Sequence, residues 1–104
     1  MASPDTPPRR TVTCSVSAVE DLKRIRAWYA DQGAAEAGGR LLADVLAQVE
    51  RLADFPESGR VVPEFGRARI REIVHPPFRI VYRLDPRRVR VVRVWRSERL
   101  LQLP

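Results

Sequence analysis

The sequence predicts an α+β fold in which a helical hairpin packs on a small, mostly antiparallel sheet. Two observations predict it: apolar residues recur with a helical period through most of the first half, and the period changes to two after about residue 66. A chain of 104 residues has room for one core. We therefore expect a flexible lead-in over residues 1–10, which hold three prolines, and one domain over residues 11–104.

The predicted domain begins with a short strand and a helix. Residues 11–16 alternate polar and apolar side chains, as a strand does. Ser17 and Glu20 have the spacing of a capping box, so we expect the helix to begin there. Gly33 suits the left-handed end of this helix. One apolar face follows the helical period and consists of Ala18, Leu22, Ile25 and Tyr29.

A second helix is expected from about residue 34 to residue 55, and Pro56 ends it. Leu42, Val45, Val49 and Leu52 form its apolar face. Gly38 and Gly39 weaken its first turns by ~1 kcal/mol each relative to alanine. This end of the helix is therefore expected either to fray or to lie close against another backbone.

Three strands are expected after a loop over residues 56–66, at residues 69–74, 78–84 and 89–96. If Leu84 faces Val89 across the last turn, one face of the sheet is largely apolar and packs on the helices. That face carries Phe78, Ile80, Tyr82, Leu84, Val89, Val91, Arg93 and Trp95. The opposite face carries Arg79, Arg83, Arg90 and Arg96 among Val81, Val92 and Val94, and is expected to be basic.

The net charge of +6 is unevenly distributed along the chain. Residues 1–59 hold 7 basic and 9 acidic side chains, a balance of −2, whereas residues 60–104 hold 12 and 4, a balance of +8. All basic residues except Lys23 are arginines, whose guanidinium groups suit phosphate and carboxylate. The basic sheet face is therefore either a solvated surface or a binding site for an anionic partner.

Several classes of protein are excluded by composition. One histidine and one cysteine, far apart in sequence, give no usable metal-ligand spacing, and no glycine-rich phosphate loop is present. We expect neither metal nor cofactor. No apolar run approaches the ~20 residues that span a bilayer. A lone Cys14 agrees with a reducing compartment, so we expect a cytoplasmic protein that does not bind membranes.

Arginine clusters can stabilise the charges that develop during RNA cleavage, but the 2′-hydroxyl also needs a proton acceptor. The candidate acceptors in this sequence are Glu64, Glu72, His75, Tyr82 and Glu98. None of them stands in a sequence pattern that marks a general base. The sequence is therefore poorly equipped for this reaction.

An ordered set of short motifs between about residue 12 and residue 101 resembles the RelE/ParE toxins of bacterial type II toxin–antitoxin systems. The motifs are Asp21-Leu22 with Ile25 and Tyr29, the loop at residues 55–60 with Pro63-Glu64, the pair Arg71-Glu72, and residues 78–83. The loop and the last of these motifs look most like the ParE branch. Trp95 and Arg99 fit the end of the family's last strand, whereas Arg96 replaces a histidine usual there.

The resemblance implies a toxin that poisons DNA gyrase without an enzymatic step and is neutralised by a cognate antitoxin. It places target binding on Arg60, Arg71, Arg79, Arg83, Arg96 and Arg99. It places antitoxin binding on Leu22, Ile25, Trp28 and Tyr29, although Trp28 can also simply pack on the sheet. Two alternatives remain open. One is a RelE-like ribosome-dependent mRNA endoribonuclease, which needs no metal and uses Arg79 and Arg99. The other is an inactive toxin fold that only partners its antitoxin in operator regulation.

Overall fold

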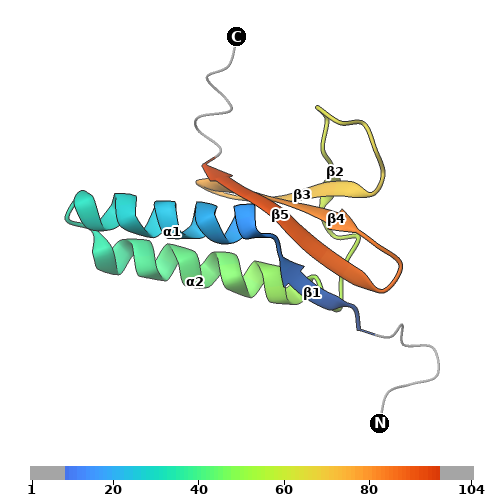
Figure 1. Ribbon diagram of the computed structural model, residues 1–104, viewed down its shortest axis with the longest axis horizontal. Helices are drawn as coiled ribbons and strands as arrows, with labels where there is room; N and C mark the ends of the chain where they lie inside the picture. Colours follow the sequence, from blue (N-terminus) through green and yellow to red (C-terminus); the bar gives the residue numbers. More distant parts are fainter. Residues whose placement is uncertain (1–8, 97–104) are drawn as a thin grey trace.

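The computed structural model describes residues 9–96 and has two helices on one face of a five-stranded sheet (Figure 1). The elements are β1 (Thr11–Cys14), α1 (Val16–Asp31), α2 (Ala35–Arg51), β2 (Arg60–Val61), β3 (Ile70–His75), β4 (Phe78–Leu84) and β5 (Arg88–Arg96). The strand order is β1-β5-β4-β3-β2. β1 runs parallel to β5, and the other pairs are antiparallel. The predicted fold class is confirmed.

α1 begins two residues before the predicted capping box. Ser15, not Ser17, is its N-cap: the Ser15 hydroxyl accepts a hydrogen bond from the Ala18 amide at 3.0 Å and donates one to the Val92 carbonyl, also at 3.0 Å. The Ser15 amide bonds to the Val91 carbonyl, so β5 holds the cap in place. The C-terminal end of α1 follows the prediction, because Gly33, just after the helix, has a left-handed φ of +72°.

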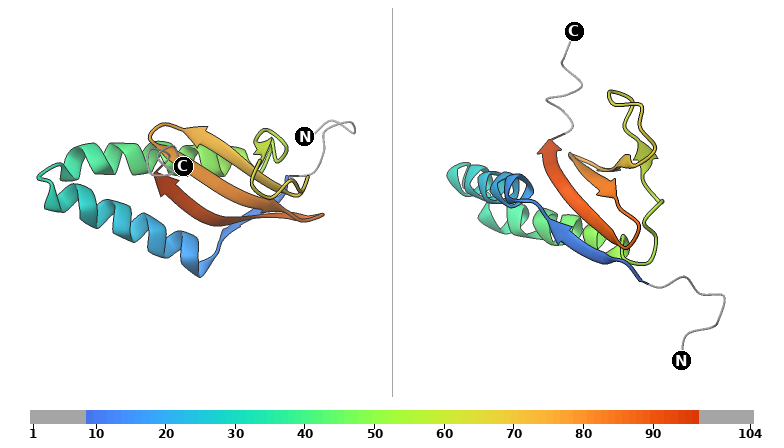
Figure 2. Two further views of the ribbon diagram at one scale, coloured as in Figure 1. Left: turned by 90° about the horizontal axis from the view of Figure 1, so that it is seen from above. Right: turned by 45° about the vertical axis from the view of Figure 1, so that its right-hand side comes forward.

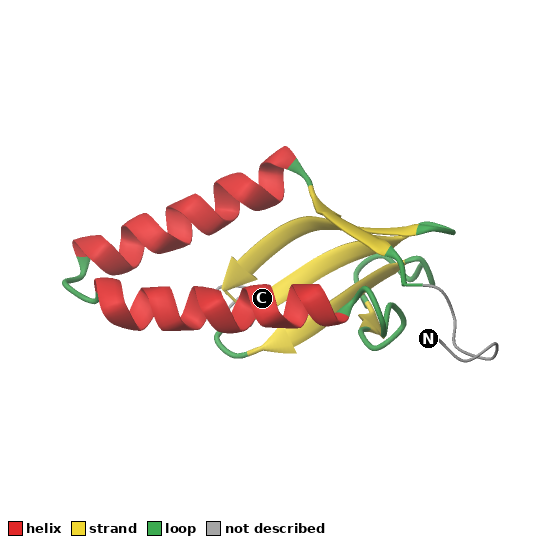
Figure 3. Cartoon of the chain, turned by 90° about the horizontal axis from the view of Figure 1, so that it is seen from below, coloured by secondary structure: helices red, strands yellow, loops and turns green. Residues whose placement is uncertain are grey.

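The two helices converge at their short connection and spread apart over the sheet (Figure 3). α2 ends at Arg51, four residues before the predicted end, and a turn carries the chain to Pro56. Gly38 explains the close approach at the start of α2. A Cβ built on it would lie 2.5 Å from the Cβ of Tyr29 in α1, whereas one built on Gly39 meets nothing within 4 Å.

β2 is a two-residue strand that the sequence pattern did not predict, because two residues are too few to show a period. Arg60 pairs with Glu72 and Val61 with Arg71, so β2 extends the sheet beside β3. Tyr82 holds the preceding loop: its hydroxyl donates to the Pro56 carbonyl at 2.8 Å and accepts from the Gly59 amide at 2.9 Å. This loop therefore lies against the sheet.

A β-bulge in β5 changes which side chains face the helices. Leu84 pairs with Val89 as predicted, but Tyr82 pairs with Val91 while its neighbour Val81 pairs with Arg93. Val92 is thus an extra residue, and the alternation of β5 is offset beyond it. Four predicted positions are wrong for this reason: by register, Val94 and Arg96 lie on the side of the sheet that faces the helices, and Arg93 and Trp95 lie on the other side, although the Arg93 side chain reaches past the strand edge to α1.

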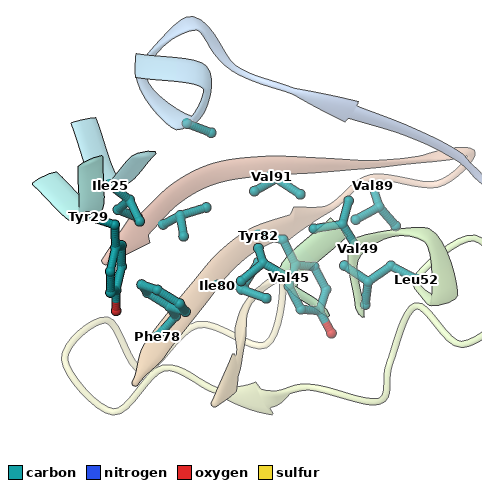
Figure 4. Close-up of a cluster of buried hydrophobic side chains, with 12 residues drawn as sticks. Ile25, Tyr29, Val45, Val49, Leu52, Phe78, Ile80, Tyr82, Val89 and Val91 are labelled. Carbon is teal, nitrogen blue, oxygen red and sulfur yellow. The ribbon is translucent and has the colours of Figure 1, made fainter. Parts of the chain in front are cut away.

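Both helices lie over the same face of the sheet (Figure 2). The core fills the space between the helices and this face (Figure 4). α1 contributes Ala18, Ile25 and Tyr29, and α2 contributes Val45 and Val49, followed by Leu52. The sheet contributes Phe78, Ile80, Tyr82, Val89, Val91 and Val94. Val94 enters this core only because of the bulge.

Candidate functional site

A groove of about 720 Å³ runs between α1 and the outer edge of β5. We call it the α1–β5 groove. Its lining residues are Asp21, Arg24, Ile25, Trp28, Tyr29, Arg93, Val94, Trp95 and Arg96. The groove exists because β1 pairs with β5 only as far as Val91, so the rest of this edge faces α1 instead of a strand.

Aromatic side chains form the apolar wall of the α1–β5 groove. Trp28 stays 46% exposed, and its ring stands edge-on to Tyr29 with the centroids 5.0 Å apart. The guanidinium of Arg96 lies 4.4 Å from the centroid of the Trp28 ring, a cation–π contact. A large aromatic with a polar neighbour and half its surface exposed is suited to anchor a partner chain.

Asp21 lines the α1–β5 groove and stabilises the edge of β5. Its carboxylate accepts a hydrogen bond from the Val94 amide at 2.9 Å and forms a bidentate ion pair with the Arg93 guanidinium, at 2.7 and 2.9 Å. The hydrogen bonds to Asp21 raise the pKa of Arg93. Asp21 was seen in the sequence only as part of a family motif. Its pairing with Arg93 depends on the bulge, which periodicity does not indicate.

The predicted antitoxin-binding residues divide between the core and the groove. Ile25 and Tyr29 line the groove but are themselves mostly buried in the core. Leu22 packs against the core and is not a lining residue. Trp28 alone of the four presents a large exposed surface.

A buried ion-pair network occupies the face of the sheet that points away from the helices. The Glu72 carboxylate has no exposed side-chain surface and binds Arg60 at 2.7 Å and, at short range, Arg79. Arg79 is 7% exposed and also binds Glu64 at 2.9 Å. Burial acts to lower the pKa of Arg79, but the hydrogen bonds that Arg79 donates to Glu72 and Glu64 outweigh it and the pKa is raised. The predicted basic surface is therefore largely neutralised around Arg79.

The other arginines predicted to bind the target have different surroundings. Arg71 donates to the carbonyls of Ala68 and Gly59 at 3.0 Å and so holds the loops beside β3. Arg83 binds Asp85 at 3.0 Å. Arg96 lies in the groove, and Arg99 lies outside the described residues. The structure thus does not bring the six arginines together on one face.

Few of the candidate proton acceptors are placed to serve as a base. Glu72 is buried between two arginines, and the Tyr82 hydroxyl is engaged in the loop while burial raises its pKa. Hydrogen bonding to Arg79 lowers the pKa of Glu64. His75 ends β3, with its Nε2 4.0 Å from Asp44, and Glu98 lies outside the described residues.

Two further observations concern the described part of the chain alone. No group of three or more histidine, cysteine, aspartate or glutamate side chains in residues 9–96 is arranged to hold a metal ion. Neither helix there has the length and apolar character needed to cross a membrane.

Two solved structures with a similar fold come from toxin–antitoxin systems. One is a chromosomal ParDE system from P. aeruginosa, with a TM-score of 0.72 and 20% identity over 86% of this chain and 98% of that one. Another is a RelBE toxin–antitoxin complex from Mycobacterium tuberculosis, with a TM-score of 0.63 and 22% identity over 85% and 98%. No curated protein sequence matches the chain. The fold class is therefore that of the RelE/ParE toxins.

The family follows from the sequence match. The family model described as the ParE toxin of the type II toxin–antitoxin system parDE matches residues 12–101. The chain therefore belongs to the ParE toxin family, as the motifs of the sequence indicated.

Proposed function

We propose that this ParE-family toxin stops bacterial growth by poisoning DNA gyrase and that a cognate antitoxin neutralises it. The observation that carries the choice of target is the state of Arg79. The ribonuclease alternative needs this arginine to stabilise charge on RNA, but it is buried and bonded to two carboxylates. Among residues 9–96, the carboxylate beside Arg79 that is not fully buried is that of Glu64, which is itself paired with Arg79 and has a lowered pKa.

The toxic surface proposed here uses the arginines that do not hold the buried network together. Arg99 follows the last described strand, and Arg83 is only partly buried beside Asp85. Arg79 is a poor choice for testing the surface, since its removal leaves the buried Glu72 carboxylate with Arg60 alone and costs stability, up to ~3–5 kcal/mol, the figure for a buried charge left without a partner. Arg99→Ala leaves the pairs of Glu72 with Arg60 and Arg79 in place.

Induced expression of the chain without its partner tests the target. Gyrase poisoning predicts a DNA-damage response in cells and a loss of supercoiling activity by purified gyrase. Arg99→Ala is expected to weaken the damage response and to restore part of the supercoiling activity. Arg26→Ala, which removes an exposed arginine of α1, is the matched control and is expected to remain toxic. Cleaved transcripts with intact supercoiling would favour the ribonuclease. Normal growth with folded protein would favour the inactive toxin fold.

The proposed antitoxin site is the α1–β5 groove, where an amphipathic segment of the antitoxin packs on Trp28. A half-exposed aromatic beside Ile25 and Tyr29 fits such a segment. Trp28→Ala is expected to weaken the complex by ~2 kcal/mol, about 30-fold. Leu46→Ala, an equally exposed apolar side chain on α2 outside the groove, serves as the control in the same titration. A folded Trp28→Ala variant with wild-type affinity would reject this site.

A further inference from the structure

The end of the sheet where β4 turns into β5 carries a second basic surface, which shares only Arg83 with the proposed toxic surface. We call it the hairpin arginine cluster and define it as Arg69, Arg83, Arg87, Arg88 and Arg90. Asp85 is the acidic residue of this turn, and Arg69 and Arg83 both bind it, at 2.9 and 3.0 Å. Five guanidinium groups against one carboxylate leave a formal charge of +4.

Three of these arginines keep their charge uncompensated within the described chain. Arg87 and Arg88 are exposed and Arg90 is partly buried, and none of them has a carboxylate within ion-pair distance among residues 9–96. By contrast, Arg60 and Arg79 form ion pairs with Glu72 and Glu64, which balance their charges. Three uncompensated positive charges of the second half therefore lie at this end of the sheet.

The strand register arranges three of these arginines as a grid on one face of the sheet. Arg83 lies opposite Arg90 on neighbouring strands, and Arg88 lies two residues before Arg90 on the same face. These positions are about 5 Å apart across the sheet and about 7 Å apart along the strand. β1 continues the grid with hydroxyl side chains, because Thr11 pairs with Arg88 and Thr13 with Arg90. The exposed Thr11 hydroxyl adds a hydrogen-bond donor beside the guanidinium groups.

We propose that the hairpin arginine cluster binds the phosphate backbone of duplex DNA without reading its sequence. Duplex DNA presents about one negative charge per 1.7 Å of its axis, so a grid of this spacing meets several phosphates at once. Arginine forks bind phosphate oxygens bidentately. The cluster lies on strands and their turn, so no helix presents it to the base edges of the major groove.

Other anionic partners suit this surface less well. The cluster contains no aromatic side chain on which the bases of a single strand could stack. It also lacks an exposed large apolar side chain, which a membrane surface or a protein hot spot requires. Val89, the apolar residue between Arg88 and Arg90, is fully buried. Backbone phosphates of a duplex need neither feature.

The cluster is also separate from the α1–β5 groove. It lies at the start of β5, whereas Arg96 at the end of that strand stacks on Trp28. Eight residues of strand put about 26 Å between the two positions. DNA binding therefore goes beyond the proposed function: it requires neither gyrase nor antitoxin, and it is measured without either.

The experiment is a fluorescence anisotropy titration of the purified chain into a labelled duplex of mixed sequence, about 20 base pairs long, at salt concentrations between roughly 50 and 200 mM. We expect log K to fall with log salt with a slope of about −3 to −4, as four or so neutralised phosphates require. The triple variant Arg87→Ala, Arg88→Ala, Arg90→Ala is expected to bind the duplex at least about tenfold more weakly. The magnitude of its salt slope is expected to be smaller by about 2 to 3.

The matched control removes the same charge from the helices. Lys23, Arg26 and Arg40 are exposed, and the triple alanine variant at these positions is expected to bind DNA with an affinity within about threefold of the wild type. Thermal melting confirms that both variants fold, and the exposed single variant Arg88→Ala, with about one unit less slope, provides a second reading. Equal losses in both triple variants, no duplex binding by the wild type at low salt, or binding to phosphatidylserine vesicles without binding to duplex would each overturn the proposal.

Discussion

Adjacent glycines in α2 have opposite structural roles, which the sequence left unresolved. The sequence predicted only that Gly38 and Gly39 would weaken the helix start or allow a close approach. The structure assigns the close approach to Gly38, whose missing Cβ makes room for the Cβ and Cγ of Tyr29. Gly39 faces open space and contributes only flexibility. The distinction depends on how α1 crosses α2, and no local pattern carries that information.

Alanine substitutions at these two positions are expected to change stability in opposite directions. Gly38→Ala forces the helices apart, since the atoms met are the base of Tyr29 and not a flexible tip, and costs ~1–3 kcal/mol. Gly39→Ala stabilises by ~0.5–1 kcal/mol because it removes glycine's extra unfolded-state freedom. Urea unfolding followed by circular dichroism measures both. Changes of the same sign would show that the two helices do not meet as described.

At the scale of elements, the junction of β1, α1 and β5 depends on one serine. The Ser15 hydroxyl accepts from the Ala18 amide and donates to the carbonyl of Val92, the bulged residue. Ser15→Ala is therefore expected to cost ~1–2 kcal/mol, at the upper end for a lost N-cap, because the bulge loses a partner as well. Ser17→Ala, the predicted cap and now an exposed position within α1, is the control and is expected to be within ±0.5 kcal/mol. Comparable losses at both positions would restore Ser17 as the cap.

The same junction marks the boundary of what the sequence could predict. Periodicity predicted the helices, and with them the inward positions of Ile25 and Tyr29, because a helix keeps its register over many residues. It also predicted the β4–β5 turn, since Leu84 does pair with Val89. The bulge at Val92 adds one residue without a local sign in a run of valines and arginines. The positions of Val94, Arg96 and the Asp21–Arg93 pair therefore could not be predicted.

At the scale of the whole molecule, the excess positive charge of the second half is partly neutralised within the fold. Each carboxylate of residues 60–96 binds at least one arginine: Glu72 and Asp85 bind two each, and Glu64 binds Arg79. The few carboxylates of the basic half thus each reduce the repulsion between neighbouring arginines. Part of the remaining charge lies at the hairpin arginine cluster, at the opposite end of β5 from the groove.

This arrangement makes the fold sensitive to acid. Hydrogen bonding to Arg79 lowers the pKa of Glu64 below its ordinary 4.5, and hydrogen bonding to Arg83 lowers that of Asp85 below its ordinary 3.8. A carboxyl whose pKa is lower in the folded state contributes stability above its unfolded pKa and loses it as the pH falls through the folded value. We therefore expect stability to be nearly constant between pH 7 and about 5 and to fall below about pH 4.5.

Thermal melting of the wild type and of the Glu64→Gln, Asp85→Asn double variant at pH 7, 5 and 3 measures this contribution, with the pH values taken on either side of the unfolded pKa values of about 4. Both side chains are near the surface, so the difference between the two proteins at neutral pH is expected to be modest and to shrink with added salt. At pH 3 the two melting temperatures are expected to converge, because the wild-type carboxylates are then being protonated. A difference that stays constant from pH 7 to pH 3 would mean that these pairs do not stabilise the fold through their charge.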